Sequence, residues 1–195
     1  MYNSKLITGK LLRWQNYLNK HTLPGWDDLP SLGLYMDQVI TLISQYLSFL
    51  PANTEDQVIT ASAINNYVIM KIMPAPEKKK YYRIHIAYLI MICSLKQSLS
   101  ISDIQRIIPA VLNEAEVKDA YNDFVSKYTG SMQLFVDLVE QQTKSIFDES
   151  GDIDQNVNSF VLLTAVVANF SKILTTKMLD LQDRPFSEEA VAEKE

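Results

Sequence analysis

The chain is short of cysteine, glycine and proline. Its 195 residues include one cysteine, five glycines and seven prolines. The single cysteine, Cys93, excludes an intramolecular disulfide and any metal site built from paired cysteines, and it fits a reducing compartment. So few glycines and prolines argue against a turn-rich all-β fold.

The sequence also lacks a signal for secretion or for membrane insertion. The N-terminal residues MYNSKLITGKLLRW have no apolar signal core. The longest apolar run, near 160–170, contains Thr164 and Asn169, and Lys172 follows it. We predict that this run is too short to span a bilayer, which takes roughly 20 apolar residues. A cytoplasmic protein without a membrane partner is therefore expected.

Motifs of catalysis and of metal binding are missing as well. The sequence has no Gly-rich phosphate loop, nucleophile elbow or His-rich metal triad. The acidic stretch 148–156 suggests a calcium loop, but Val157 and Leu163 stand where that loop needs Gly and Glu. We predict that the protein is not an enzyme and uses no cofactor and no metal.

Charge is distributed unevenly along the chain. The net charge is −5, yet residues 60–106 carry seven basic and two acidic side chains, a local excess of +5. A basic segment within an acidic protein is typical of a local nucleic-acid contact. A solvated charged surface without a partner is the alternative.

Hydrophobic spacing predicts a helical protein. The hydrophobic content of 47% suffices for one core or for two small packed subdomains. Apolar residues at helical spacing predict helices over 4–20 and 35–50, joined by an irregular loop over 22–34.

The middle of the chain predicts a helix, a turn, a wing and two further helices. Thr60 is the expected N-cap of a short helix that ends before Pro74. Residues 77–82 are short, basic and aromatic, as in a two-stranded wing. An apolar helix over 83–99 and a capped helix over 100–109 follow.

Past this module, the sequence predicts three shorter helices and a tail. Breaks at Pro109, Gly130 and Gly151 are expected to separate these helices from the module and from one another. The acidic residues 182–195 are predicted to be disordered.

Residues 60–108 resemble the DNA-binding domain of the MerR family of bacterial regulators. Thr60-Ala61-Ser62-Ala63-Ile64-Asn65-Asn66-Tyr67, followed by Pro74, resembles that family's Ser-Pro-Arg-Thr-Leu-Arg-Tyr-Tyr segment and its proline. Tyr82 before an apolar helix, and Leu99-Ser100-Ile101-Ser102-Asp103-Ile104 after it, are also similar to the family's pattern. The resemblance implies a winged helix-turn-helix that binds duplex DNA.

Two features depart from that family. Asn65 and Asn66 stand where the family has Arg and Tyr, which typically contact phosphates. Asparagine has no charge for a phosphate, but its carboxamide suits a bidentate contact with adenine. MerR proteins dimerise through one long helix after the module, whereas the predicted breaks at Gly130 and Gly151 argue against such a helix here.

A larger part of the chain, roughly residues 26–180, resembles an uncharacterised bacterial family found mostly in Gram-positive species. The stretches that carry this resemblance are Leu34-Tyr35-Met36-Asp37-Gln38-Val39, Ile64-Asn65-Asn66-Tyr67-Val68, and Lys79-Lys80-Tyr81 followed by His85. It implies the same winged-helix fold and no established activity.

We therefore predict an all-α protein with a small β wing, in which a MerR-like winged helix-turn-helix is flanked by helices. The predicted parts are an N-terminal helix and loop (1–34), the winged module (35–109), a C-terminal helical subdomain (110–181) and the tail (182–195). The flanking helices are expected to pack on the module or to build a homodimer.

The leading hypothesis is a transcriptional regulator that binds double-stranded DNA. Its second helix would enter the major groove while the basic wing holds phosphates. The predicted contacts are Thr60, Ser62, Asn65, Asn66, Ile69, Lys71, Lys78, Lys79, Lys80, Tyr82 and Arg83.

Two other interpretations stay open. One is a protein-interaction module on a winged-helix scaffold that has lost DNA binding, as the two asparagines would allow. The other is a small-molecule effector enclosed by residues 110–181, with an aromatic stripe as its lining. The stripe comprises Tyr121, Phe124, Tyr128 and Phe135, which would otherwise be ordinary core.

Overall fold

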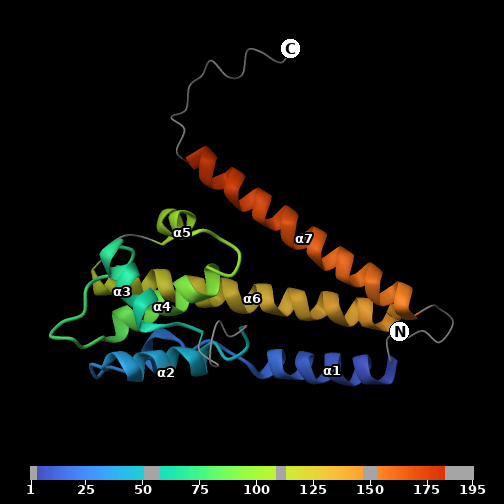
Figure 1. Cartoon of the computed structure of the whole chain (residues 1–195), viewed down its shortest axis with the longest axis horizontal. Coiled ribbons are helices and arrows are strands. Elements are labelled where there is room, and N and C mark those ends of the chain that lie inside the picture. The colour runs from blue at the N-terminus through green and yellow to red at the C-terminus, as the bar shows by residue number, and fades with distance from the viewer. Residues whose placement is uncertain (1–3, 51–57, 109–112, 147–152, 183–195) are drawn as a thin grey trace, which may run out of the picture.

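The computed structural model describes residues 4–50, 58–108, 113–146 and 153–182. Over these ranges the protein is all-α, as predicted, and no sheet forms (Figure 1). The elements are α1 (Ser4–Lys20), η1 (Trp26–Asp28), α2 (Met36–Tyr46), α3 (Ala61–Ile69), α4 (Arg83–Leu95), α5 (Ile101–Ile107), α6 (Glu114–Ile146) and α7 (Ile153–Gln182).

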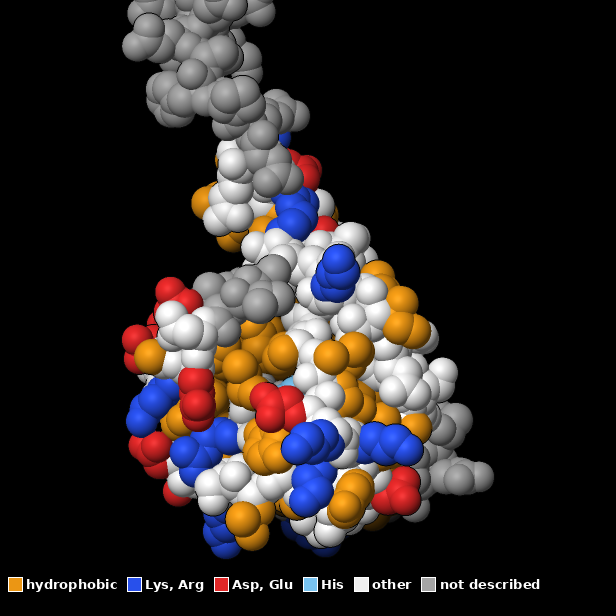
Figure 2. All heavy atoms as spheres, turned by 90° about the vertical axis from the view of Figure 1, so that its left-hand side faces the viewer, with side chains coloured by type: hydrophobic (Ala, Val, Ile, Leu, Met, Phe, Trp, Pro, Cys, Tyr) orange, Lys and Arg blue, Asp and Glu red, His pale blue; other side chains and the backbone are white. Residues whose placement is uncertain are grey.

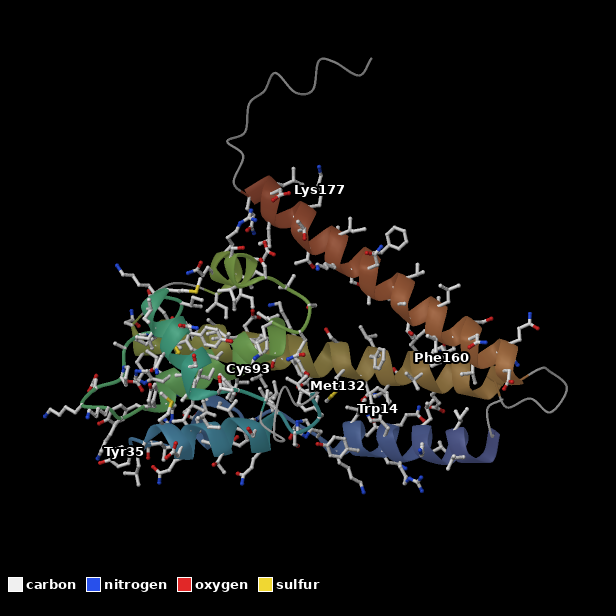
Figure 3. All side chains as sticks on the ribbon, in the orientation of Figure 1. Trp14, Tyr35, Cys93, Met132, Phe160 and Lys177 are labelled. Carbon is white, nitrogen blue, oxygen red and sulfur yellow. The ribbon has the colours of Figure 1, made fainter. Side chains whose placement is uncertain are left out.

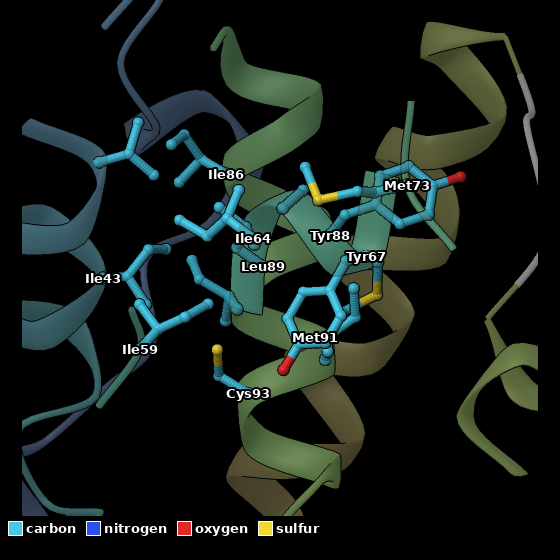
Figure 4. Packing of buried hydrophobic residues seen from close by; sticks show 14 of the residues in the cluster. Ile43, Ile59, Ile64, Tyr67, Met73, Ile86, Tyr88, Leu89, Met91 and Cys93 are labelled. Atoms are coloured by element: carbon cyan, nitrogen blue, oxygen red, sulfur yellow. The ribbon is translucent and has the colours of Figure 1, made fainter. Parts of the chain in front are cut away.

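Helix α4 is the centre of the core. Every residue from His85 to Cys93 is buried, because this segment is apolar on all sides and is surrounded by α2, α3 and α6. Figure 4 shows Ile43 and Ile64 packing beside Leu89 of this helix. Burial raises the pKa of the Cys93 thiol to about 12, so Cys93 is a core residue, as its place in an apolar helix predicts.

Two predicted helix starts are confirmed, whereas a start at Ser131 and one capped by Asn156 or Asn158 are wrong, since α6 runs through Ser131 and α7 begins at Ile153. The Thr60 hydroxyl accepts a hydrogen bond from the Ala63 amide at 3.2 Å, which caps α3. The Ser100 hydroxyl accepts the Asp103 amide at 3.1 Å and caps α5 in the same way. Two helices end earlier than expected, α2 at Tyr46 and α4 at Leu95.

The predicted break at Gly130 is wrong. Helix α6 runs without interruption over 33 residues, from Glu114 to Ile146. Gly130 does not adopt a positive φ, and nothing lies within 4 Å of the Cβ that it lacks. A glycine costs a helix only about 1 kcal/mol relative to alanine. Here that cost is offset because α6 packs along α1 and α4 on either side of Gly130.

Three expectations fall on residues outside the described ranges. These are the helix end at Pro109, the break at Gly151 and the tail after Gln182. The boundary predicted between residues 109 and 110 likewise stays a prediction. The first half of α6 nevertheless shares the core of the preceding helices, since Val117 and Tyr121 belong to the same buried cluster as α4.

Helix α6 is fastened to the loop after α1. The Tyr121 hydroxyl donates to the Pro24 carbonyl at 2.8 Å, and the Trp26 amide donates to Asn122 Oδ1 at 3.3 Å. Burial raises the pKa of Tyr121 well above its usual value. Three of the four stripe aromatics (Tyr121, Phe124 and Tyr128) pack in or against the core, and Phe135 meets the Trp14 ring edge-on. Tyr121, Phe124 and Tyr128 are therefore packed as ordinary core, whereas Phe135 is 39% exposed.

Helix α7 leaves the far end of α6 and slants back toward α5 (Figure 1). Among the described residues it is one helix that is long and apolar enough, by length and composition, to cross a membrane. Those two properties do not distinguish a spanning helix from one that packs against protein. The expected absence of a membrane partner therefore stays a prediction.

Candidate nucleic-acid interface

The polar face of α3 is open to solvent. Ile64 and Tyr67 point into the core, and four side chains on the other side are exposed. Ile69 is the most open of them, with 75% of its surface exposed. The exposed set is the one predicted to face DNA, namely Ser62, Asn65, Asn66 and Ile69. Thr60 differs, because its hydroxyl is occupied by the helix cap.

The end of α3 is closed by a lysine in a left-handed conformation. The Ile72 amide donates to the Tyr67 carbonyl at 3.0 Å, and the Lys71 amide donates to the Val68 carbonyl at 3.0 Å. This is the Schellman pattern, in which the residue after the helix usually is glycine. Lys71 occupies that position with φ 57° and is exposed to solvent.

The predicted wing is a minimal hairpin. Glu77 and Lys80 exchange backbone hydrogen bonds of 3.0 and 2.8 Å, and only Lys78 and Lys79 lie between them. Both lysines have positive φ, 49° and 65°, as the central residues of a type I′ turn require. The expected two-stranded β wing is therefore not formed as a sheet. The segment between the two prolines and Tyr82 is too short for more than one bridged pair.

The hairpin is anchored to the loop before α2. Leu34 and Tyr81 exchange two backbone hydrogen bonds, each 2.8 Å long. Next to this bridge, Gly33 lies so close to the Tyr82 ring that an added Cβ would stand 2.9 Å from two ring carbons. The hairpin therefore projects from a packed base, and it forms one end of the molecule (Figure 1).

Of the predicted basic contacts, Lys71 and the two tip lysines are exposed to solvent, whereas Lys80 and Arg83 are half-buried. Lys80 is half-buried, with its ammonium 5.5 Å from the centre of the Tyr35 ring. The Arg83 Nε donates to the Leu29 carbonyl at 3.1 Å, and its guanidinium lies over Trp26. These two cations hold the base of the hairpin.

Tyr82 is half-buried and serves mainly in packing. Its amide donates to His85 Nδ1 at 2.9 Å at the start of α4. Since Nδ1 accepts that bond, the imidazole proton is on Nε2, which donates to the Ala75 carbonyl at 3.1 Å. His85 is buried and joins the beginning of the hairpin segment to its end.

A polar pocket lies beside the base of the hairpin. It has a volume of about 320 Å³ and is lined by Glu77, Tyr82, Arg83 and Glu114, among others. Two carboxylates accompany its one guanidinium, so the pocket is not suited to an anion.

The surface around α3 also exposes apolar side chains that the sequence patterns did not single out. Met70 is 47% exposed and Ile107 of α5 is 39% exposed. Gln105 of α5 donates to the Met70 carbonyl at 2.8 Å, which ties the end of α3 to α5. Figure 2 shows this end of the molecule, with basic side chains in its lower half and hydrophobic ones among them.

Together these elements define an all-α protein whose short capped helix, basic hairpin and central helix form one packed unit. The chain belongs to the family described as domain of unknown function (DUF1836), whose model matches residues 24–124. This match fits the sequence resemblance to an uncharacterised family and ends within the first half of α6. It lends no support to MerR-like DNA binding. Neither a curated protein nor a solved structure matches the chain.

Proposed function

We propose that this protein is a sequence-specific binder of duplex DNA that acts in transcriptional regulation. The observation that carries the proposal is the identity of three residues. Lys71, Lys78 and Lys79 are the non-glycine residues with positive φ among those the structure describes. All three are exposed lysines on one short stretch of chain.

A positive φ is unfavourable for lysine. Glycine or asparagine would adopt a positive φ at less cost. Lysine destabilises the folded state by roughly 1 kcal/mol or more at each such position. Folding alone would therefore favour Asn-Gly at the hairpin tip. Lysine at all three positions is what a requirement for positive charge would produce, and backbone phosphates supply the complementary charge.

The exposed face of α3 supports the same proposal. Asn65 and Asn66 are free of the core, and a carboxamide matches the donor and acceptor of adenine in the major groove. The order α3, hairpin, α4, α5 and long α6 resembles the order of elements that the MerR resemblance implies, with the hairpin in place of a β wing and with the long helix that was not expected here. In this proposal α3 enters the groove while Lys71, Lys78 and Lys79 contact phosphates.

Selection from random duplexes tests the proposal. We expect enrichment of one sequence class and loss of its binding in the double variant Lys78→Glu and Lys79→Glu. The matched control is Lys10→Glu with Arg13→Glu, which changes the net charge equally on exposed positions of α1. If no sequence is enriched, or if both double variants bind the duplex equally, the proposal is wrong.

A protein-interaction module is the second candidate, and the apolar surface at Ile69, Met70 and Ile107 favours it. An Ile69→Lys variant separates the two functions. It would strengthen non-specific duplex binding by adding a cation beside the lysines, whereas it would disrupt an apolar docking surface.

A further inference from the structure

Helix α7 turns a broad apolar face to solvent. Among the described residues its main contacts are with α6 near its beginning and with α5 near its end, where Arg106 and Asp180 lie 3.5 Å apart (Figure 1). Along the helix ten large apolar side chains are 38% to 65% exposed. They are Val161, Leu162, Leu163, Val166, Val167, Phe170, Ile173, Leu174, Met178 and Leu181.

Five of the exposed side chains fall on the a and d positions of a heptad pattern, namely Leu163, Val167, Phe170, Leu174 and Leu181. With Phe160 as the first a position, the a positions continue at Val167, Leu174 and Leu181, and the d positions are Leu163, Phe170 and Lys177. Six of these seven residues are apolar. A heptad seam sustained over three repeats is the surface by which one helix packs against another. Figure 3 labels Phe160 and Lys177 near the two ends of α7.

We propose that this seam, here called the α7 seam, pairs with the α7 seam of a second copy of the chain. The eight exposed side chains on and beside the seam, which leave out Val161 and Leu162, offer roughly 800 Å² of surface, which is what each partner contributes to an interface of standard size. A two-fold dimer needs a surface that is complementary to itself. The α7 seam meets that condition in one orientation.

That orientation is antiparallel, with the two-fold axis midway between Val167 and Phe170. Leu163 then faces Leu174 of the partner subunit, and Val167 faces Phe170 of the partner subunit. Outside these layers, Val166 lies beside the partner's Ile173. A parallel pair in register would instead set the two Lys177 ammonium groups against each other in the seam, which like charges disfavour.

Lipid is a poorer occupant of this surface. The side of α7 opposite to the seam carries Asn158, Asn169, Lys172 and Thr176 beside the exposed Val161 and Leu162, so this side is largely polar. Lysine at the centre of a spanning helix is unfavourable. A helix lying on a membrane usually carries several cations on its polar face, and here Lys172 is accompanied by Asp154.

The α7 seam is distinct from α6, the helix that directly follows the module. The inference does not rest on DNA binding, although a dimer would present two copies of α3 to one duplex. It can therefore fail or succeed independently of the proposed function.

Sedimentation equilibrium on the full chain tests the proposal. We expect a dimer for the unmodified protein and at least about a hundredfold weaker association for Phe170→Glu with Leu174→Glu, since the seam would bury unpaired carboxylates. The control, Ala165→Glu with Asn169→Glu, adds the same two negative charges at exposed positions opposite to the seam and should stay dimeric. A monomeric unmodified protein, or a double variant that dimerises normally, would overturn the proposal.

Cysteine crosslinking fixes the orientation. Leu163→Cys with Leu174→Cys should give a disulfide-linked dimer. The two positions are about 16 Å apart within one helix, so a disulfide between them can form only between two subunits. Leu174→Cys alone should not crosslink.

Flotation with vesicles of phosphatidylcholine and phosphatidylglycerol tests lipid as the occupant. Crosslinking by Leu174→Cys alone, or vesicle binding that the Phe170→Glu and Leu174→Glu variant loses, would contradict an antiparallel dimer.

Discussion

Leu34 and Tyr81 form a reciprocal pair of backbone hydrogen bonds, each 2.8 Å long, between the loop before α2 and the end of the basic hairpin. The pair holds the hairpin from the side opposite to its tip. Because Tyr81 is buried and His85 joins both ends of the hairpin segment, the tip lysines project from a base with little freedom to move. Rigid presentation of charge is what a phosphate contact requires.

The base of the hairpin should be sensitive to one methyl group. Gly33→Ala would put a Cβ within 2.9 Å of the Tyr82 ring and 3.0 Å of Lys80 Cβ, so the ring or the hairpin must move. We expect a loss of about 1 to 3 kcal/mol in the free energy of unfolding, measured in urea. An unchanged stability would show that the Gly33 contact is not tight.

The tip lysines should oppose stability and support binding. Replacing them by Asn and Gly, as Lys78→Asn with Lys79→Gly, should raise the free energy of unfolding by about 1 kcal/mol or more, because the turn then has its preferred residues. The same variant should bind the selected duplex more weakly. A variant that is destabilised would show that the turn does not have positive φ at both residues.

Gly130 should behave as a helix interior residue. Gly130→Ala is expected to raise the free energy of unfolding by about 1 kcal/mol, since nothing obstructs the new Cβ. Thermal and urea unfolding measure this difference. If Gly130 ended a helix in a left-handed conformation, the same change would destabilise the protein instead.

Cys93 should react slowly with alkylating agents in the native protein. The thiolate is the reactive form, and burial raises the pKa of this thiol from 9.0 to about 12. At pH 8 the thiolate fraction then falls by about a thousandfold relative to an ordinary thiol. Iodoacetamide labelling with and without urea measures the rates. Rapid labelling of the native protein would mean that α4 is not the centre of the core.

Local chemistry made most helices predictable from the sequence. Thr60 and Ser100 have hydroxyls that cap α3 and α5, and the uninterrupted apolar run of α4 could only be buried. The same local reasoning failed at Gly130, where packing along α1 and α4 outweighs the glycine.

The candidate site was only partly predictable. The exposed residues of α3 follow from helical periodicity, whereas the engagement of Arg83 with Leu29 and of Lys80 with Tyr35 depends on loops distant in the sequence. The positive φ of Lys71, Lys78 and Lys79 could not be predicted from the sequence, because turns of these kinds usually carry glycine or asparagine and not lysine. The outward orientation of the apolar face of α7 depends on how that helix leaves α6.

The salt dependence of duplex affinity decides whether the exposed lysines contact phosphates. The slope of log affinity against log salt concentration counts phosphate contacts, at roughly 0.9 per contact. For the triple variant Lys71→Ala, Lys78→Ala and Lys79→Ala, the account predicts a slope shallower by about 2 to 3 than that of the unmodified protein. Equal slopes for the two proteins would contradict it.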